Sequence, residues 1–345
     1  MTGEFTREEI YSQPSAWSDA LDVMRQKYAT LSALVQAGKY DSVIFTGCGS
    51  TYYLSLAAAT LFQQLNHVYA RALPASEIWL NPASSFQPQS RTLLVAVSRS
   101  GETTETLYAV EKFNNEASGD VITLSCYGEK SLAHAGDINL VLPSGQERSI
   151  AQTRAFSVLY LSAVSLAASF GSHSNLLDEL AALPEIGERL IKTYADQAVV
   201  WGRKTHLERF YFLGSGARYG LACELNLKMK EMSLTHSEPF HFMEFRHGPQ
   251  SMVTPETLIF GLLSGQNYAH ENQVLTEMRQ RGAHVLSLGE DEADIELTSG
   301  LSEAARNVLY LPFGQIMAYE RSLAKGLNPD RPNNLDAVVR LNGST

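Results

Sequence analysis

The chain has 345 residues, enough for two domains of ordinary size, and its 44% hydrophobic and 19% charged residues are ordinary proportions for a globular protein. Its net charge of −10 argues against nucleic acid or an anionic membrane as a partner, so any phosphate must be held by local geometry. The three cysteines, Cys48, Cys126 and Cys223, are far apart, which suits a reducing compartment and offers no disulfide or zinc framework.

The amino terminus shows no basic stretch followed by an apolar one, as a secretory signal would. The most apolar segment, residues 158–170, holds three serines and is too short to span a bilayer, so it predicts a buried helix. We therefore expect a cytoplasmic protein without a membrane partner.

In chain order, a helical segment at residues 7–38, broken at Gln13-Pro14, precedes an alternation of apolar strands and helices. Such alternation is typical of a parallel, doubly wound sheet. The first series comprises strands at residues 43–46, 92–97, 121–125 and 138–142 and helices at residues 54–65, 103–114 and 153–170.

A turn at residues 171–175 and a helix at residues 176–196 lead to a second series. It comprises strands at residues 210–213, 257–263 and 285–288, helices at residues 221–233 and 271–281, a last helix opened by Pro312, and a Pro/Asn-rich tail at residues 327–345. We predict an α/β fold of two tandem doubly wound, flavodoxin-like domains with parallel sheets. The expected parts are an N-terminal helical segment at 1–30, a first domain at 31–175, a connecting helix at 176–197, and a second domain with the tail at 198–345.

One signature occurs in both series, namely an apolar run, a Gly-x-Gly turn and a helical pattern. Parallel sheets present backbone N–H groups to an anion in this way. Four residues of the first copy align with four of the second: Gly47, Gly49, Tyr52 and Leu54 with Gly214, Gly216, Tyr219 and Leu221. The repeat indicates a duplicated unit and a protein that binds phosphate esters.

Two loops are expected to meet at the carboxyl edge of the first sheet, where ligands of doubly wound sheets bind. They span residues 48–51 and 98–104, and each joins a buried strand to a helix N-terminus. The five hydroxyls between residues 98 and 106 exceed what helix capping requires. We favour a neutral hydroxyl cradle for a phosphate monoester over the alternative of caps and turns, and we expect Cys48 to be a small packed residue.

On the helix after the second Gly-x-Gly turn, Glu224, Lys228 and Glu231 are spaced i, i+4 and i+7, which places them on one face. A solvated Glu–Lys pair is the alternative. The next residues, 237–249, are predicted to be irregular, are dense in His, Glu and aromatic side chains, and end in His247-Gly248-Pro249. A carboxylate and an imidazole in such a stretch can form a proton-transfer pair.

These motifs resemble the sugar isomerase (SIS) fold, a phosphosugar-binding fold. The resemblance extends over about residues 30–340. Within it, the chain resembles the isomerase domain of glucosamine-6-phosphate synthase. It resembles even more closely the stand-alone double-SIS proteins described as glucosamine-6-phosphate deaminases or sugar-phosphate ketose/aldose isomerases. The segments that carry it are residues 47–51, 98–103, 145–147, 153–156 and 224–249.

The resemblance implies roles by position. Glu231 matches the base that moves a proton between C1 and C2, and His247 matches the histidine that opens the sugar ring from a neighbouring subunit; Glu224 and Lys228 match supporting charged positions. The expected sugar-phosphate-binding residues are Cys48, Gly49, Ser50, Thr51, Ser98, Arg99, Ser100, Thr103 and Gln152, the last at a place that usually carries a small hydroxyl residue. The family implies a homodimer with sites at the subunit interface, and we expect no metal or other cofactor.

Two departures from the synthase shape the functional prediction. Only about 40 residues precede the first predicted strand, so we expect no glutaminase domain, and Ala337 stands where the synthase tail has an imine-forming lysine. We therefore expect an isomerase or deaminase that converts a glucosamine 6-phosphate-like amino-sugar phosphate to fructose 6-phosphate and ammonia. The alternatives are a deglycase of phosphorylated sugar–amino-acid (Amadori) adducts and a non-catalytic sugar-phosphate sensor.

Overall fold

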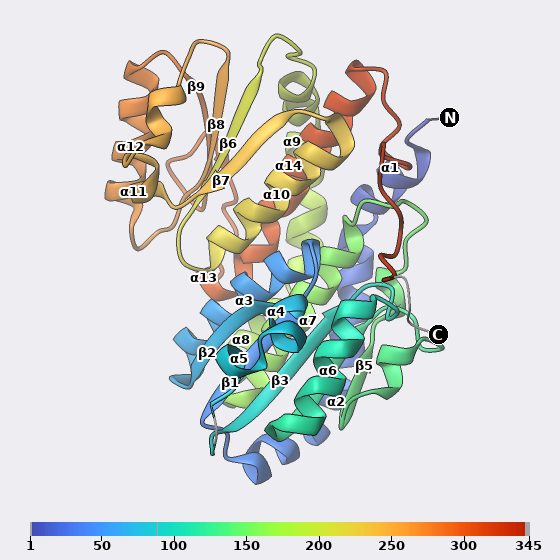
Figure 1. The fold of residues 1–345 in the computed structure, drawn as a ribbon. Coiled ribbons are helices and arrows are strands. Elements are labelled where there is room, and N and C mark those ends of the chain that lie inside the picture. The colour runs from blue at the N-terminus through green and yellow to red at the C-terminus, as the bar shows by residue number, and fades with distance from the viewer. Residues whose placement is uncertain (1, 88, 342–345) are drawn as a thin grey trace. The chain divides into compact units, whose positions relative to one another are not determined.

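The computed structural model describes residues 2–87 and 89–341, which form two units with one sheet each (Figure 1). The first-sheet unit comprises Ser15–Glu147, Arg154–Ala181 and Asp336–Thr345, and the second-sheet unit comprises Met1–Pro14, Arg148–Thr153 and Ala182–Leu335. The domain boundaries expected from the sequence stay a prediction, and residues 342–345 of the predicted tail lie outside the described residues.

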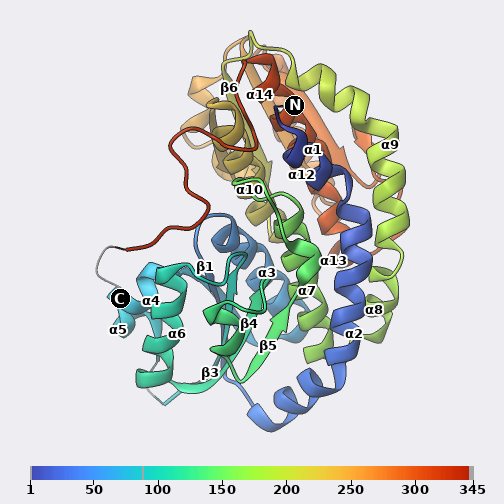
Figure 2. The same cartoon turned by 90° about the vertical axis from the view of Figure 1, so that its right-hand side faces the viewer.

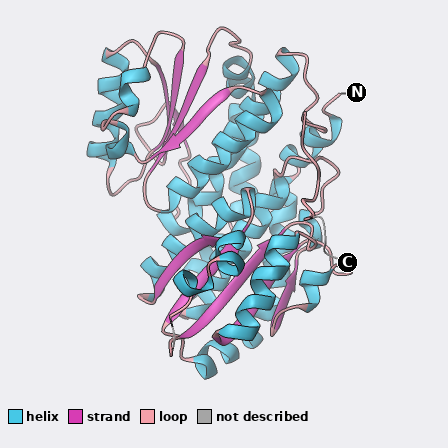
Figure 3. Cartoon of the chain, in the orientation of Figure 1, coloured by secondary structure: helices cyan, strands magenta, loops and turns pink. Residues whose placement is uncertain are grey.

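The first sheet has five parallel strands in the order β2-β1-β3-β4-β5. Figure 3 draws the strands in magenta among the cyan helices. Their bounds are β1 Ser42–Gly47, β2 Tyr69–Pro74, β3 Arg91–Ser98, β4 Ser118–Ser125 and β5 Ile138–Val141. Strand β3 is buried along almost its whole length, as expected for an apolar strand covered on both faces.

Helices cover both faces of the first sheet (Figure 2). One face carries α4 (Ala75–Leu80), α5 (Pro82–Ser85) and α6 (Thr104–Glu116), and the other carries α2 (Gln13–Gly38), α3 (Ser50–Asn66), α7 (Arg154–Phe170) and α8 (Ser174–Leu180). Helix α7 contains the apolar segment noted in the sequence, and its side chains are buried all round. It is therefore the buried helix that the sequence predicts.

The second sheet has the order β10-β9-β8-β6-β7, with β6 at Arg209–Gly214, β7 at His236–Phe240, β8 at Thr257–Leu262, β9 at His284–Gly289 and β10 at Ile295–Glu296. Helices α9 (Leu183–Gly202), α10 (Ala217–Ser233) and α14 (Leu311–Ala324) pack together on one side. On the other side, α11 (Phe242–Phe245) and α12 (Tyr268–Gln280) bury aromatic and aliphatic side chains against the sheet. The remaining helices are α1 (Glu4–Tyr11) and α13 (Glu303–Arg306), with short 3₁₀ turns at Ser131–His134, Pro143–Gly145, Pro249–Met252 and Asn307–Tyr310.

The predicted α/β class with two parallel sheets is confirmed, but three strands were not predicted from the sequence: β2, β7 and the two-residue β10. Residues 237–249 are not irregular throughout, because they contain most of β7 and all of α11. Strands β2 and β7 both lie at a sheet edge, where one side needs no hydrogen-bonding partner, so they tolerate Pro74 and Pro239 and show no apolar run. None of the described helices is both long and apolar enough to cross a membrane.

Candidate functional site

The turn between β1 and α3 is shaped by two glycines and one hydroxyl. Gly49 has a φ of +55°, which favours glycine, and a Cβ at Gly47 would lie 2.5 Å from the Thr51 Oγ1 atom. The Thr51 hydroxyl accepts the Cys48 N–H at 2.9 Å and donates to the Cys48 carbonyl at 3.0 Å. The turn thus holds Ser50 at the start of α3, where backbone N–H groups and the helix dipole favour an anion.

Three hydroxyls of the loop after β3 converge, and we call Ser98, Ser100 and Thr103 the hydroxyl cradle. Ser98 Oγ lies 3.4 Å from Ser100 Oγ and 3.2 Å from Thr103 Oγ1, and the last two are 3.4 Å apart. Thr103 is the N-cap residue of α6, yet its side chain makes no capping hydrogen bond. The Thr103 hydroxyl therefore contacts the other two hydroxyls of the cradle and does not cap the helix.

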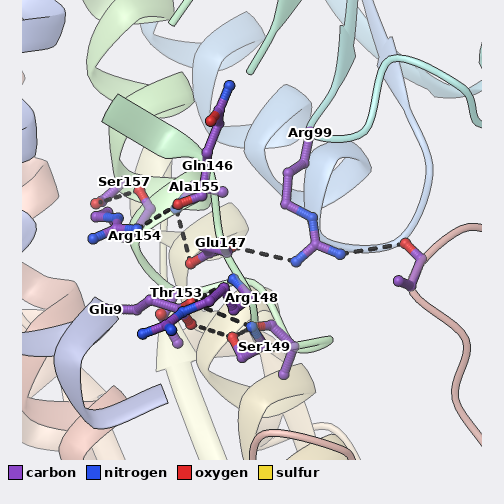
Figure 4. A network of polar contacts seen from close by, with 12 residues as sticks. Glu9, Arg99, Gln146, Glu147, Arg148, Ser149, Thr153, Arg154, Ala155 and Ser157 are labelled. Carbon is purple, nitrogen blue, oxygen red and sulfur yellow. Dashed lines mark hydrogen bonds and ion pairs between the residues drawn. The ribbon is translucent and has the colours of Figure 1, made fainter. Parts of the chain in front are cut away.

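Arg99, within the same loop, points to a different set of partners (Figure 4). Its guanidinium lies 3.3 Å from the carboxylate of Glu147, whose side chain is fully buried, and donates to the Ala337 carbonyl at 3.3 Å. Glu147 also accepts the Ala155 N–H at 3.1 Å, near the start of α7. Arg99 thereby links the loop after β3 to α7 and to the tail, and its predicted contact with phosphate stays a prediction.

The tail makes two further contacts at this loop. Arg340 pairs with Glu102 at 3.0 Å, and the Leu341 N–H donates to Thr104 Oγ1 at 3.4 Å. Desolvation acts to raise the pKa of Glu102, but hydrogen bonds and the charges of Lys130 and Arg340 outweigh it and lower that pKa. Ala337 contributes its backbone carbonyl here.

Cys48 behaves as the small packed residue expected from the sequence. Its thiol is partly buried, and its Sγ lies 3.6 Å from Thr106 Oγ1. Burial is the main cause that raises the pKa of this thiol to about 12. Near pH 7 the side chain is a neutral thiol, which is a poor nucleophile.

The second Gly-x-Gly turn repeats the backbone of the first. Gly216 has φ +59° and ψ −136°, close to the φ +55° and ψ −122° of Gly49. The side chains differ, because buried Arg218 lies 3.5 Å from buried Glu271, whose carboxylate accepts the Ser264 N–H at 2.7 Å. The loop after β8, at the position where the first sheet has its hydroxyl cradle, is thus bound by the carboxylate of Glu271 from α12.

The predicted stripe on α10 is present and buried. Lys228 Nζ lies 2.5 Å from Glu231 Oε2 and 3.4 Å from Glu224 Oε1. The side chains of Lys228 and Glu224 are 0% exposed, and that of Glu231 is 18% exposed. This excludes the alternative of a solvated pair, and it leaves Glu231 as the one carboxylate of the stripe that a ligand can reach.

The two histidines near α11 differ in their surroundings. His247 lies after α11 and its side chain is exposed. Among the described residues, 2–87 and 89–341, its imidazole forms no hydrogen bond or ion pair with Glu231. His241 is also exposed at its surface, but its ring stacks on Tyr219 with ring centroids 3.9 Å apart, and partial desolvation lowers its pKa. The ring-opening role of His247 remains a prediction.

Two buried carboxylates were missed as candidates, Glu147 and Glu9. Glu9 is 2% exposed and lies on the buried face of α1, where Glu9 and Ile10 follow Thr6 by three and four residues. A charged residue on such a face was the available signal. Gln152 lies in the segment Arg148–Thr153, which adjoins Glu147. In the described part of the chain, no cluster of His, Cys, Asp or Glu side chains is arranged to hold a metal ion.

A curated relative, the glutamine–fructose-6-phosphate aminotransferase (isomerizing) of Methanothermobacter thermautotrophicus, is 28% identical over 350 residues, with 97% of this chain and 57% of that protein covered. The chain therefore spans somewhat more than half the length of the relative it matches.

Two solved structures share the fold. Glucosamine-6-phosphate deaminase from Thermotoga maritima is 28% identical with a TM-score of 0.74, covering 94% of this chain and 100% of that one. Tagatose-6-phosphate ketose/aldose isomerase from Escherichia coli is 23% identical with a TM-score of 0.86, covering 96% of each chain. A family model described as SIS domain matches residues 38–169 and 205–317, and so the chain belongs to the SIS domain family.

Proposed function

We propose that the chain is a sugar-phosphate isomerase of the deaminating kind, which converts a glucosamine 6-phosphate-like substrate to fructose 6-phosphate and ammonia. The observation that carries the proposal is the buried stripe on α10, in which Lys228 holds Glu231 while leaving it partly exposed. A base must keep both a fixed position and access to its substrate, and this carboxylate has both. The similarity to a deaminase and to an aminotransferase supports the amino-sugar phosphate as substrate.

In the proposed mechanism, the hydroxyl cradle and the N-terminus of α6 bind the phosphate, and His247 assists ring opening. Glu231 then takes the proton from C2 while the C1 oxygen gains a proton from solvent, which leaves an enolamine. Glu231 returns its proton to C1, which leaves a protonated imine at C2. Water adds to the C2 imine, and ammonia departs as the ketone forms. The ammonium of Lys228 donates to the Glu231 carboxylate and so fixes the position of the base.

The first test measures ammonia release from glucosamine 6-phosphate together with exchange of the C2 proton for deuterium. Glu231→Gln should lower kcat by about 10²- to 10⁴-fold, the usual contribution of a general base. Glu208→Gln changes an exposed carboxylate just before β6 and should leave kcat unchanged. Full activity in Glu231→Gln would refute the assignment of the base.

A substrate panel separates the alternatives. It contains hexose 6-phosphates, amino-hexose 6-phosphates and phosphorylated sugar–amino-acid adducts, and it reads isomer, ammonia and amino acid separately. Release of an amino acid from the adducts would favour a deglycase instead. Binding of sugar phosphates without deuterium exchange at C2 would favour a sensor.

The proposal includes a cytoplasmic homodimer in which His247 acts in the site of the neighbouring subunit. Light scattering tests the dimer. Mixing Glu231→Gln chains with His247→Ala chains would create one intact site in each mixed dimer, so activity should return to about a quarter of the wild-type value for random two-fold assembly. No recovery on mixing, with dimers formed, would place both groups in one chain.

A further inference from the structure

A buried carboxylate on the N-terminal helix α1 holds the segment Arg148–Thr153, which we call the Gln152 loop. Glu9 accepts the backbone N–H of Arg148 at 2.6 Å and that of Ser149 at 3.2 Å, and the Ser149 hydroxyl also donates to it (Figure 4). Hydrogen bonds to an ionised acceptor are about twice as strong as neutral ones. One side chain therefore fixes two consecutive peptide units at the start of this loop.

Contacts from the C-terminal part of the second-sheet unit fix the rest of the loop. The Ile150 N–H donates to the Asp330 carbonyl at 3.0 Å, and the Asp330 carboxylate in turn accepts from Thr6 on α1 at 2.8 Å. Gln315 on α14 donates to the Thr153 carbonyl at 3.3 Å. The backbone on both sides of Gln152 is therefore held by buried polar groups.

Gln152 itself differs from its neighbours in the loop. Its Oε1 atom is buried and accepts no hydrogen bond within the part of the chain that the structure describes. A buried amide oxygen without a donor is an unfavourable arrangement in a protein interior, unless a ligand supplies the donor. A sugar hydroxyl is a donor of the required kind.

We propose that Glu9 is a positioning residue: by fixing the Arg148 and Ser149 backbone it orients the Gln152 amide toward a hydroxyl of the bound sugar phosphate. This inference rests on the proposed function, because it uses a sugar phosphate as the ligand. Glu9 acts through the loop and does not itself contact the substrate.

The test compares Glu9→Gln with Glu8→Gln. Glutamine keeps the size of Glu9 but removes its charge and turns one acceptor into a donor. Glu8 is the matched control, because it pairs at 2.7 Å with the exposed guanidinium of Arg148 and leaves the loop backbone untouched. Glu9→Gln should lower kcat/KM by about 10- to 100-fold, the effect of one or two hydrogen bonds to a charged group, and Glu8→Gln by less than about threefold. Glu9→Asp, which keeps the charge, should recover part of the loss.

The double variant Glu9→Gln/Gln152→Ala distinguishes positioning from general stability. If Glu9 acts through Gln152, the double variant is no slower than Gln152→Ala alone, whereas independent effects multiply. Amide hydrogen exchange supplies a second readout, since the Ser149 N–H should lose protection in Glu9→Gln. Multiplying losses, or an unchanged kcat/KM in Glu9→Gln, would overturn the inference.

The outcomes also separate this inference from the proposed function. If Glu9→Gln folds poorly, Ser149→Ala removes one donor and keeps the buried carboxylate, and it should show a smaller loss in the same direction. If the wild type turns over no sugar phosphate, the proposed function fails, and calorimetric affinity for glucosamine 6-phosphate then decides the inference. An affinity unchanged by Glu9→Gln overturns it, and a wild type that does not bind overturns both.

Discussion

Replacing Lys228 with methionine should strongly destabilise the second-sheet unit. The lysine ammonium lies 2.5 Å from Glu231 and 3.4 Å from Glu224, and both its own side chain and that of Glu224 are fully buried. Methionine fills a similar volume, so the change removes the charge while disturbing the packing little. The Glu224 carboxylate then stays in the interior without its ammonium.

The size of the effect follows from the geometry. At an effective dielectric constant of about 20, unit charges 3.4 Å apart attract each other by about 5 kcal/mol. Removing one partner of a buried pair generally costs about 3–5 kcal/mol, so we expect that loss for Lys228→Met. Because domains are stable by only about 5–15 kcal/mol, this is a large fraction. At roughly 2–4 °C per kcal/mol for a unit of this size, the melting temperature should fall by about 6–20 °C.

Thermal and urea unfolding followed by circular dichroism measure this loss. Lys228→Met/Glu224→Met should recover most of the stability, because no uncompensated charge remains at that position. A loss below about 1 kcal/mol, or a double variant as unstable as the single one, would refute the reasoning.

Three further predictions concern other charged or titratable side chains. Arg218→Met should lower the free energy of unfolding in urea by about 3–5 kcal/mol, because it leaves buried Glu271 without its arginine. Arg279→Met, in the exposed pair with Asp294, should lower it by less than about 1 kcal/mol, and equal losses would contradict this reasoning. Iodoacetamide at pH 8 should modify Cys48 of the folded protein far more slowly than that of the urea-unfolded protein, because burial raises its pKa to about 12, and mass spectrometry should find it unmodified when the unfolded chain is fully labelled. The pKa of His241 is lowered by partial desolvation, so the unfolded state binds its proton more readily and stability should fall as the pH drops below 6.5; His241→Phe should remove part of that pH dependence, and an imidazole that titrates above 6.5 by NMR would contradict it.

The elements that the sequence predicted correctly are those whose signals are local. The alternation of apolar strands and helices predicts two parallel sheets, and the spacing of Glu224, Lys228 and Glu231 predicts their common face. The two Gly-x-Gly turns predict a repeated backbone, and Gly49 and Gly216 share the same left-handed φ region. Each strand, turn and helix in these patterns is a short stretch of chain, so the residues in it largely determine its conformation.

The sequence by itself thus determined the fold class, the family resemblance and the hydroxyl-rich loops. Only the tertiary structure decided that the α10 stripe is buried, that Arg99 points to Glu147 and Ala337, and that Glu9 holds a loop 140 residues away. It also decided that β2 and β7 pair at the sheet edges. The reason is that burial, ion pairing and edge pairing depend on groups far apart in the chain, and neither periodicity nor spacing carries information about such partners.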